Sequence, residues 1–340
     1  MYRSRAVLKR IPADFLVREG MALELAPAAK AVHEYLIVRK CGYTTVEAVD
    51  FLAKALNVAR EQISYAGLKD EDAITEQMVG VPIGLDTVET EQQLASEGWR
   101  WLTVQRYGYG VCPLEIGRLA GNAFRIVVRN LDPEHAAQIS RLRRIPVFVL
   151  NYYDTQRFGV PDGPKRTHYV GAALIGQDWD TALSELIGLR AKESEQASAW
   201  SGSPQEFFGS LDPRIPSFYL AAHASAKWND QLAALVRDTC HDSVYQVTFE
   251  GIDYLWTCSS ADAARILGQA STLAYPRYLF KPDGIEVTGS SRSTVVQVTV
   301  TASDEAADEF QPGKSRITLS FFLPSGCYAT SAVRQILGYC

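Results

Sequence analysis

The chain has 340 residues, and with 47% hydrophobic and 21% charged residues it has the composition of a globular protein large enough for two domains. Its formal net charge of −5 excludes a surface that is basic overall, so binding to nucleic acid would depend on a local basic groove. No run of about 18 apolar residues occurs, and the N-terminal segment is charged, so we expect neither a membrane span nor a secretory signal.

The six cysteines form no C-x-x-C pair, and no histidines lie at zinc-finger spacing from them. We therefore expect no structural metal site. Scattered free thiols are typical of a reducing compartment, which indicates a cytoplasmic protein.

Strand and helix patterns alternate along the first 160 residues. A strand is predicted at residues 34–39, and the capping box Thr44-x-x-Glu47 then predicts the start of an amphipathic helix. Asp132-Pro133-Glu134 predicts a second helix start, because proline is tolerated at the first helical position. Further strands are predicted at residues 62–65, 78–83, 100–107, 123–129 and 146–151.

The pattern changes near residue 160. Residues 165–290 hold 10 basic and 15 acidic side chains, whereas the rest of the chain is balanced, which suggests a separate inserted module. The elements predicted from here on are helices at 168–188, 217–238 and 330–337, and strands within 243–258, at 294–301 and at 316–322.

Residues 66–77 carry the most informative local pattern, because a Lys-Asp-Glu-Asp run at 69–72 follows a glycine shortly after a predicted strand. Glycine permits a turn that is closed to other residues. A cation next to Asp70 would favour its ionised form, which a reactive carboxylate needs. Taken alone, such a run is more typical of a solvated turn, because these side chains are mostly exposed.

Six motifs occur in order along the chain. They are residues 9–19 (K-x-x-P-x-D-F-x-V-x-E), 42–45 (G-Y-T-T), 66–77 (A-G-x-K-D-x-x-A-x-T-x-Q), 121–124 (G-N-x-F), 151–159 (N-Y-Y-D-T-Q-R-F-G) and 323–330 (L-P-S-G-C-Y-A-T). Together they resemble the TruD family of pseudouridine synthases over nearly the whole chain. Residues 165–290 match weakly, as the variable insertion of that family would.

The resemblance implies an α/β (α+β) protein with the pseudouridine synthase fold, in which a mixed, mostly antiparallel sheet is combined with helices. The catalytic domain would be discontinuous, at residues 1–160 and 290–340. An inserted α/β domain of the TRUD type would span residues 161–289. RNA would then lie between the two domains.

The resemblance also implies that the protein isomerises a uridine of tRNA, uridine-13 in bacterial members, to pseudouridine. Asp70 matches the catalytic aspartate of the family and would form a covalent bond either to the ribose or to the uracil ring. The target base would have to leave its stack to reach this carboxylate. We expect no cofactor, no catalytic metal and no DNA or membrane partner, and we expect a monomer that binds tRNA.

Two further motif residues match basic or aromatic positions of the family site. Lys9 would form an ion pair with Asp70 or with a substrate phosphate, although lysines outside such a context are usually solvated. Phe124 would stack on the extruded uracil, whereas the alternation of its strand alone favours a place in the core.

Four more residues are predicted to bind substrate, and two of them, Asn122 and Arg157, have an alternative role. Asn122 would hydrogen-bond the uracil edge or fix its own loop. Lys69 would assist Asp70 as a neighbouring cation. Gln156 and Arg157 follow a strand end and would meet phosphate, although Arg157 would otherwise pair with Asp154.

The chain departs from the family pattern at several positions. Asp154 replaces a glycine, Tyr153 a phenylalanine and Cys327 a serine, and residues 289–293 lack a paired arginine that many members show. Asp154 would add negative charge near the expected RNA path.

Two other functional classes stay open. The departure at Asp154 and the acidic balance are compatible with a catalytically weak protein that binds or folds tRNA. Asp70, Glu71 and Asp72 would alternatively serve a divalent-metal hydrolase, in which Asp70 and Asp72 alone point to one side of an extended segment.

Overall fold

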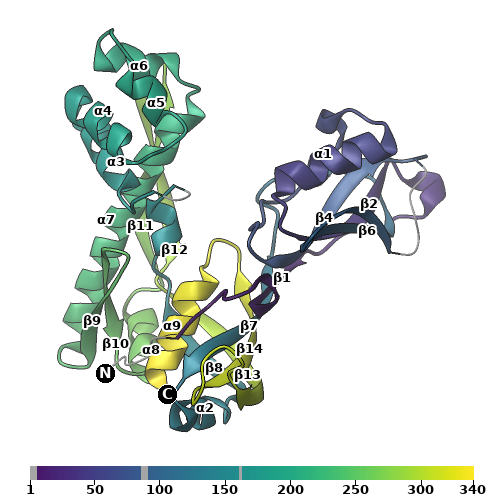
Figure 1. Cartoon of the computed structure of the whole chain (residues 1–340). Helices are drawn as coiled ribbons and strands as arrows, with labels where there is room; N and C mark the ends of the chain where they lie inside the picture. The colour runs from purple at the N-terminus through teal and green to yellow at the C-terminus, as the bar shows by residue number, and fades with distance from the viewer. Residues whose placement is uncertain (1–5, 86–90, 161–162) are drawn as a thin grey trace. The chain divides into compact units, whose positions relative to one another are not determined.

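The computed structural model describes residues 6–85, 91–160 and 163–340, and these form two compact units (Figure 1). The sheet unit consists of residues 6–146 and Val298–Ala329. The helical unit consists of Val147–Gln297 and Thr330–Tyr339. Two boundaries between the units lie at residues 146/147 and 297/298, whereas the expected domain boundaries were at residues 160 and 290. The assignment of a catalytic domain and an inserted TRUD-type domain stays a prediction.

A mixed sheet of ten strands, counted over the described residues, forms the framework of the sheet unit. Its order is β5-β6-β2-β4-β1-β7-β14-β13-β8, and β3 pairs with β4 beside this path. The β1–β4 pair is parallel, whereas β1–β7, β7–β14, β2–β4 and β2–β6 are antiparallel. The strands are β1 Phe15–Gly20, β2 His33–Cys41, β3 Ser64–Tyr65, β4 Ile74–Pro82, β5 Gln92–Glu97, β6 Arg100–Gly110, β7 Gly121–Leu131, β8 Arg143–Leu150, β13 Val295–Ala307 and β14 Ser315–Pro324.

Helix α1 (Thr45–Leu56) covers one face of this sheet at β2, β4 and β6 (Figure 1). The capping box predicted from the sequence is present, since Thr44 accepts from the backbone of Glu47 and the Glu47 carboxylate accepts from Thr44. The helix buries Val49 and Leu52 against a core that includes Leu36 of β2. The shorter helix α2 (Pro133–Ile139) begins at the predicted proline.

Strand β1 lies between β4 and β7, so it joins three of the sequence motifs in one sheet. Val17 is opposite Thr75 of β4 and also opposite Phe124 of β7. The strands approach closely at Gly121, where a Cβ atom would lie 2.1 Å from the carbonyl oxygen of Leu323 in β14. Glycine is therefore required at this position of the G-N-x-F motif.

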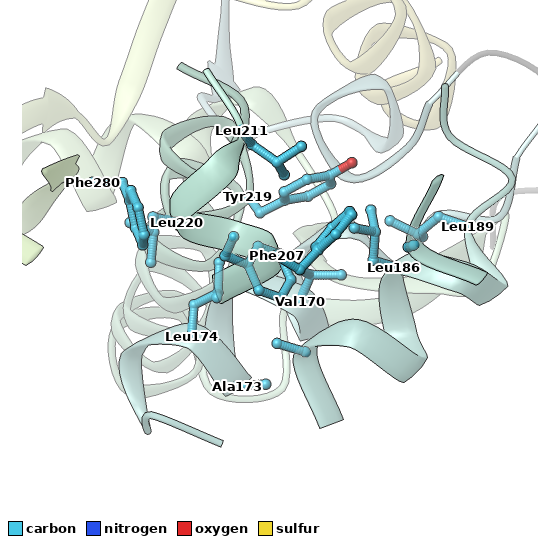
Figure 2. Packing of buried hydrophobic residues seen from close by; sticks show 13 residues of the cluster. Val170, Ala173, Leu174, Leu186, Leu189, Phe207, Leu211, Tyr219, Leu220 and Phe280 are labelled. Carbon is cyan, nitrogen blue, oxygen red and sulfur yellow. The ribbon is translucent and has the colours of Figure 1, made fainter. Parts of the chain in front are cut away.

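The helical unit packs around the long helix α7 (Arg214–Cys240), which confirms the helix predicted at residues 217–238. A core cluster of this unit brings Phe207, Tyr219 and Leu220 together with Val170 and Phe280 (Figure 2). The other elements of the unit are α3 Thr167–Ile175, α4 Trp179–Gly188, α5 Ser194–Ser198, α6 Pro204–Ser210, α8 Ser260–Gln269, the hairpins β9 Val244–Phe249 with β10 Ile252–Thr257 and β11 Thr272–Lys281 with β12 Gly284–Ser293, and α9 (Ala329–Tyr339).

The single helix predicted at residues 168–188 is wrong, because the chain forms two helices there. Gln177 adopts a left-handed φ of 56°, and the Asp178 side chain accepts from the Thr181 amide to start α4. The predicted fold class, mixed α and β with a mostly antiparallel sheet, agrees with the structure. Among the described residues, none of the helices is long and apolar enough to cross a membrane.

Candidate active site

The Asp70 carboxylate lies in the loop between β3 and β4, where it is 48% exposed. The ammonium nitrogen of Lys9 lies 2.5 Å from its Oδ2 atom and 4.3 Å from the centre of the Phe15 ring. The ion pair expected for Lys9 is thus present. The pair leaves the carboxylate open to solvent on one side, as a group that attacks a substrate must be.

The segment that carries Lys9 is fixed by a buried ion pair. Asp14 accepts two hydrogen bonds of 2.8 Å from the Arg129 guanidinium, and it also accepts from the backbone amides of Arg10 and Ile11. Because Arg129 and Asp14 are buried, each needs the other to offset the loss of hydration. Lys9 itself has a left-handed φ of 60°, which a non-glycine residue adopts only when its surroundings enforce it.

The Asp70 loop is held by groups from two other motifs. Lys69 forms an ion pair of 2.6 Å with Glu19 of β1, and both side chains are almost fully buried. The Lys69 amide donates to the Thr45 hydroxyl, which in turn donates to the Gln77 side chain. The expectation that Lys69 is the cation beside Asp70 is therefore wrong, because that place belongs to Lys9. The assignment of Lys69 as a substrate-binding residue stays a prediction.

Lys40 lies directly under the loop and was missed by the sequence reasoning. Its side chain is fully buried, and its ammonium group donates to the carbonyl oxygens of Tyr43 at 2.7 Å, Asp70 at 2.8 Å and Lys69 at 3.3 Å. Burial lowers the pKa of Lys40 to about 8, against the opposing effect of Asp70. A signal existed, because Lys40 is in phase with the buried Leu36 of its strand.

Phe124 of β7 is part of an aromatic group beside the ion pair. Its ring stacks on Phe321 of β14 at a centroid distance of 5.5 Å and meets the edge of Phe15 at 6.0 Å. Since Phe15 also contacts Lys9, a continuous set of contacts joins Asp70 to Phe124.

Asn122 precedes Phe124 by two residues and has an unused acceptor. Its side-chain oxygen Oδ1 is buried and has no hydrogen-bond partner among the described residues. A buried polar atom without a partner is costly, so it favours a ligand that supplies the missing donor.

Gln156 and Arg157 belong to the helical unit, in a short 3-10 helix at Thr155–Phe158. The Gln156 side chain is exposed, and Arg157 donates through Nε to the Ser225 hydroxyl at 3.0 Å. The structure therefore brings together five of the predicted site residues in the sheet unit, Lys9, Lys69, Asp70, Asn122 and Phe124.

The burial of Asp154 corrects two expectations, namely that it would pair with Arg157 and that it would add negative charge near the RNA path. Its side chain is 2% exposed, accepts from the Thr330 hydroxyl and lies 3.2 Å from the Arg334 guanidinium. It therefore does not pair with Arg157, and it adds no open negative charge to the surface of this unit. The replacement of glycine ties motif 151–159 to motif 323–330.

Over the described residues, no group of three or more His, Cys, Asp or Glu side chains is arranged to hold a metal ion. The hydrolase alternative with Asp70, Glu71 and Asp72 requires such a group.

Three of the sequence motifs meet in one mixed sheet, where Lys9 and Asp70 form an ion pair near Phe124. The family model for tRNA pseudouridine synthase D (TruD) matches residues 3–202, more than half of the chain. The chain therefore belongs to the TruD family of pseudouridine synthases, which are isomerases.

Full-length relatives agree with this assignment. A tRNA pseudouridine synthase D of Colwellia psychrerythraea is 26% identical over 355 residues, covering 99% of this chain and 90% of the relative. That of Geobacter metallireducens is 26% identical over 403 residues, covering 97% and 94%. A crystal structure from Methanosarcina mazei, provisionally described as TruD, superimposes with a TM-score of 0.62 at 19% identity and covers 99% of this chain and 95% of its own. At this identity the structural likeness concerns the fold alone, and it confirms the predicted fold class.

Proposed function

We propose that the protein converts uridine-13 of tRNA to pseudouridine, as a cytoplasmic monomer without a cofactor, and that Asp70 is its covalent catalyst. The observation that carries the proposal is the half-exposed Asp70 carboxylate, ion-paired to Lys9 and connected through Phe15 to Phe124. Membership of the TruD family supports the reaction class.

The reaction needs a nucleophile and a site that holds a loose base, because the product has the same atoms as the substrate. Asp70 forms an ester to C1′ of the ribose or adds to the uracil ring, and the bond between N1 and C1′ breaks. The ring then turns and C5 bonds to C1′. In the ester route this bond displaces the Asp70 carboxylate from C1′, and in the addition route the carboxylate is eliminated from the ring. C5 loses a proton and N1 gains one, so that the product leaves and Asp70 is restored. Lys9 places a positive charge beside the carboxylate before it attacks and after it is released.

The aromatic group and Asn122 bind the extruded base in this proposal. A ring that stacks on Phe124 gains roughly 1–3 kcal/mol. The free Oδ1 acceptor of Asn122 suits the N3–H donor of uracil, which remains available whichever atom is bonded to the sugar.

The test is to incubate the purified protein with an unmodified tRNA transcript and to map pseudouridine by mass spectrometry. We expect conversion at uridine-13 and none in a transcript that has cytidine at that position. Conversion only at another uridine would refute the assignment of the target. Binding of tRNA without conversion would instead favour the tRNA-binding or tRNA-folding alternative.

Lys9→Met is expected to lower kcat about 10²-fold while KM for tRNA changes little, because the change removes a charge that assists the reacting carboxylate. Lys30→Met is the matched control, because Lys30 is an exposed lysine of the same unit. Single-turnover rates at saturating protein measure the effect. A raised KM with an unchanged kcat would show that Lys9 binds a substrate phosphate instead.

A further inference from the structure

A cavity of about 570 Å³ in the helical unit has a lining of unusual charge. It lies between the start of α7 and strand β11, and its charged lining residues are Arg157, Arg214, Arg277 and Lys281. No carboxylate lines it. Its volume is within the range of sites that hold one nucleotide-sized ligand.

This charge differs from that of the surrounding segment. Residues 165–290 contain 15 acidic and 10 basic side chains, so a concavity of average composition would be acidic. A second cavity of the same unit, about 620 Å³ in volume, shows the ordinary mixture, since Lys165 and Arg166 are balanced there by Asp230, Glu250 and Asp253. Arg214 and Lys281 form ion pairs with Asp212 and Glu286, which lie outside the lining. Arg157 and Arg277 are therefore the two lining cations that have no carboxylate partner among the described residues, and they mark the first cavity as a site for an anion.

Aromatic side chains stand among these cations. Tyr153 and Tyr275 share a hydrogen bond of 2.8 Å between their hydroxyl groups, and the Arg292 guanidinium lies 4.0 Å from the centre of the Tyr153 ring. Phe218, a large apolar side chain, is 37% exposed at the same cavity. Basic groups interleaved with aromatic rings are the combination that binds single-stranded nucleic acid, where cations meet phosphate and rings stack on bases.

Two of the cations are held in different ways. Arg157 donates through Nε to Ser225, which fixes the stem of its guanidinium group. Arg277 on β11 is exposed and has no ion pair within the described residues. An unpaired arginine at a concave site loses little when it binds phosphate, because it breaks no existing ion pair.

We propose that this cavity binds one unstacked nucleotide of the tRNA substrate, with Arg277 and Arg157 on its phosphate and Tyr275 against its base. The proposal rests on the proposed function, since it names a second place where the same substrate is held. It assigns to the helical unit a share of tRNA affinity and no part in the chemical step.

The experiment compares Arg277→Glu and Tyr275→Ala with the wild type in tRNA binding and in kinetics. Arg277→Glu is expected to raise Kd and KM about 10-fold and to reduce the slope of log Kd against log salt by about 1, because one phosphate contact is lost. Tyr275→Ala is expected to raise Kd about 10-fold with an unchanged salt slope. Neither change should alter the single-turnover rate at saturating protein.

Lys227→Glu provides the matched charge reversal, because Lys227 is exposed on α7 and does not line the cavity. Equal affinities of Arg277→Glu and Lys227→Glu would overturn the proposal. So would competition by a short RNA duplex in the absence of competition by a single-stranded RNA of the same length. If the charge reversal impairs folding, Arg277→Gln serves as the second variant, because it removes the positive charge without adding a negative one.

Failure of this proposal is distinguishable from failure of the proposed function. A wild-type protein that binds tRNA but makes no pseudouridine would refute the function, while the binding comparison would still decide the role of the cavity. An active wild type with no affinity loss in either variant would refute the cavity alone.

Discussion

Asp70→Asn is expected to abolish pseudouridine formation, with a loss of at least about 10⁴-fold in kcat, the order seen when the nucleophile of a covalent mechanism is removed. An amide at this position keeps the size of the side chain but can neither carry the negative charge nor form the ester. The measurement is single-turnover conversion of tRNA by the variant, followed by mass spectrometry. Undiminished turnover would refute the assignment of Asp70.

The loss should occur without unfolding. Asp70 is about half exposed, and its ion pair with Lys9 is the type of partly solvated contact that contributes roughly 0–1 kcal/mol to stability. The melting temperature and the tRNA affinity of Asp70→Asn should therefore stay close to those of the wild type. Asp72→Asn is the matched control, because Asp72 is an exposed carboxylate of the same loop. A similar loss in both variants would indicate damage to the loop instead of loss of a nucleophile.

The fold could be predicted where local signals agreed with the tertiary structure. Helix α1 has both a capping box and an apolar face that meets the sheet, so its start at Thr45 was readable from the sequence. The hairpin of β11 and β12 was missed, because Pro276 and a run of glycine and serine near residue 290 oppose strand formation locally. Strand β11 packs against α7, a contact that no local pattern reveals.

The sequence predicted several residues of the candidate site, but not every pair that the side chains form there. The motifs supplied Lys9, Asp70, Asn122 and Phe124, and the sheet topology explains why they meet. Adjacency in sequence suggested that Lys69 assists Asp70, yet the two side chains point to different partners. The direction of a loop side chain is set by tertiary contacts, which is why this assignment required the structure.

The motif comparison could not reveal the role of Lys40. Lys40 holds the loop through the loop's backbone, by donating hydrogen bonds to the carbonyls of Lys69 and Asp70. Lys40→Met is expected to lower kcat about 10²-fold with little change in KM, since the loop at Lys69 and Asp70 loses its donor and a displacement near 1 Å costs about that factor. Single-turnover rates and tRNA affinity measure the two effects separately. Lys54→Met, which changes an exposed lysine on α1, is the control.

The pH dependence of stability and of kcat gives a second test of whether Lys40 positions the Asp70 loop. Burial lowers the pKa of Lys40 from 10.5 to about 8; Lys69 acts in the same direction, while Asp70, Glu71 and Cys41 oppose it. Between these two values the unfolded chain holds a proton that the folded chain has released. The contribution of Lys40 to the free energy of unfolding therefore increases with pH in this range, by up to about 1.4 kcal/mol per unit.

Activity should change in the opposite direction over the same range. A neutral amine has two N–H donors for three carbonyl acceptors, so one hydrogen bond under the Asp70 loop is lost and kcat falls as pH rises through 8. Above pH 8 the free energy of unfolding of the wild type should therefore rise relative to that of Lys40→Met, while the kcat of the wild type falls. The variant should show neither of these two pH-dependent changes. Identical pH profiles of stability and rate in the two proteins would mean that Lys40 does not position the Asp70 loop.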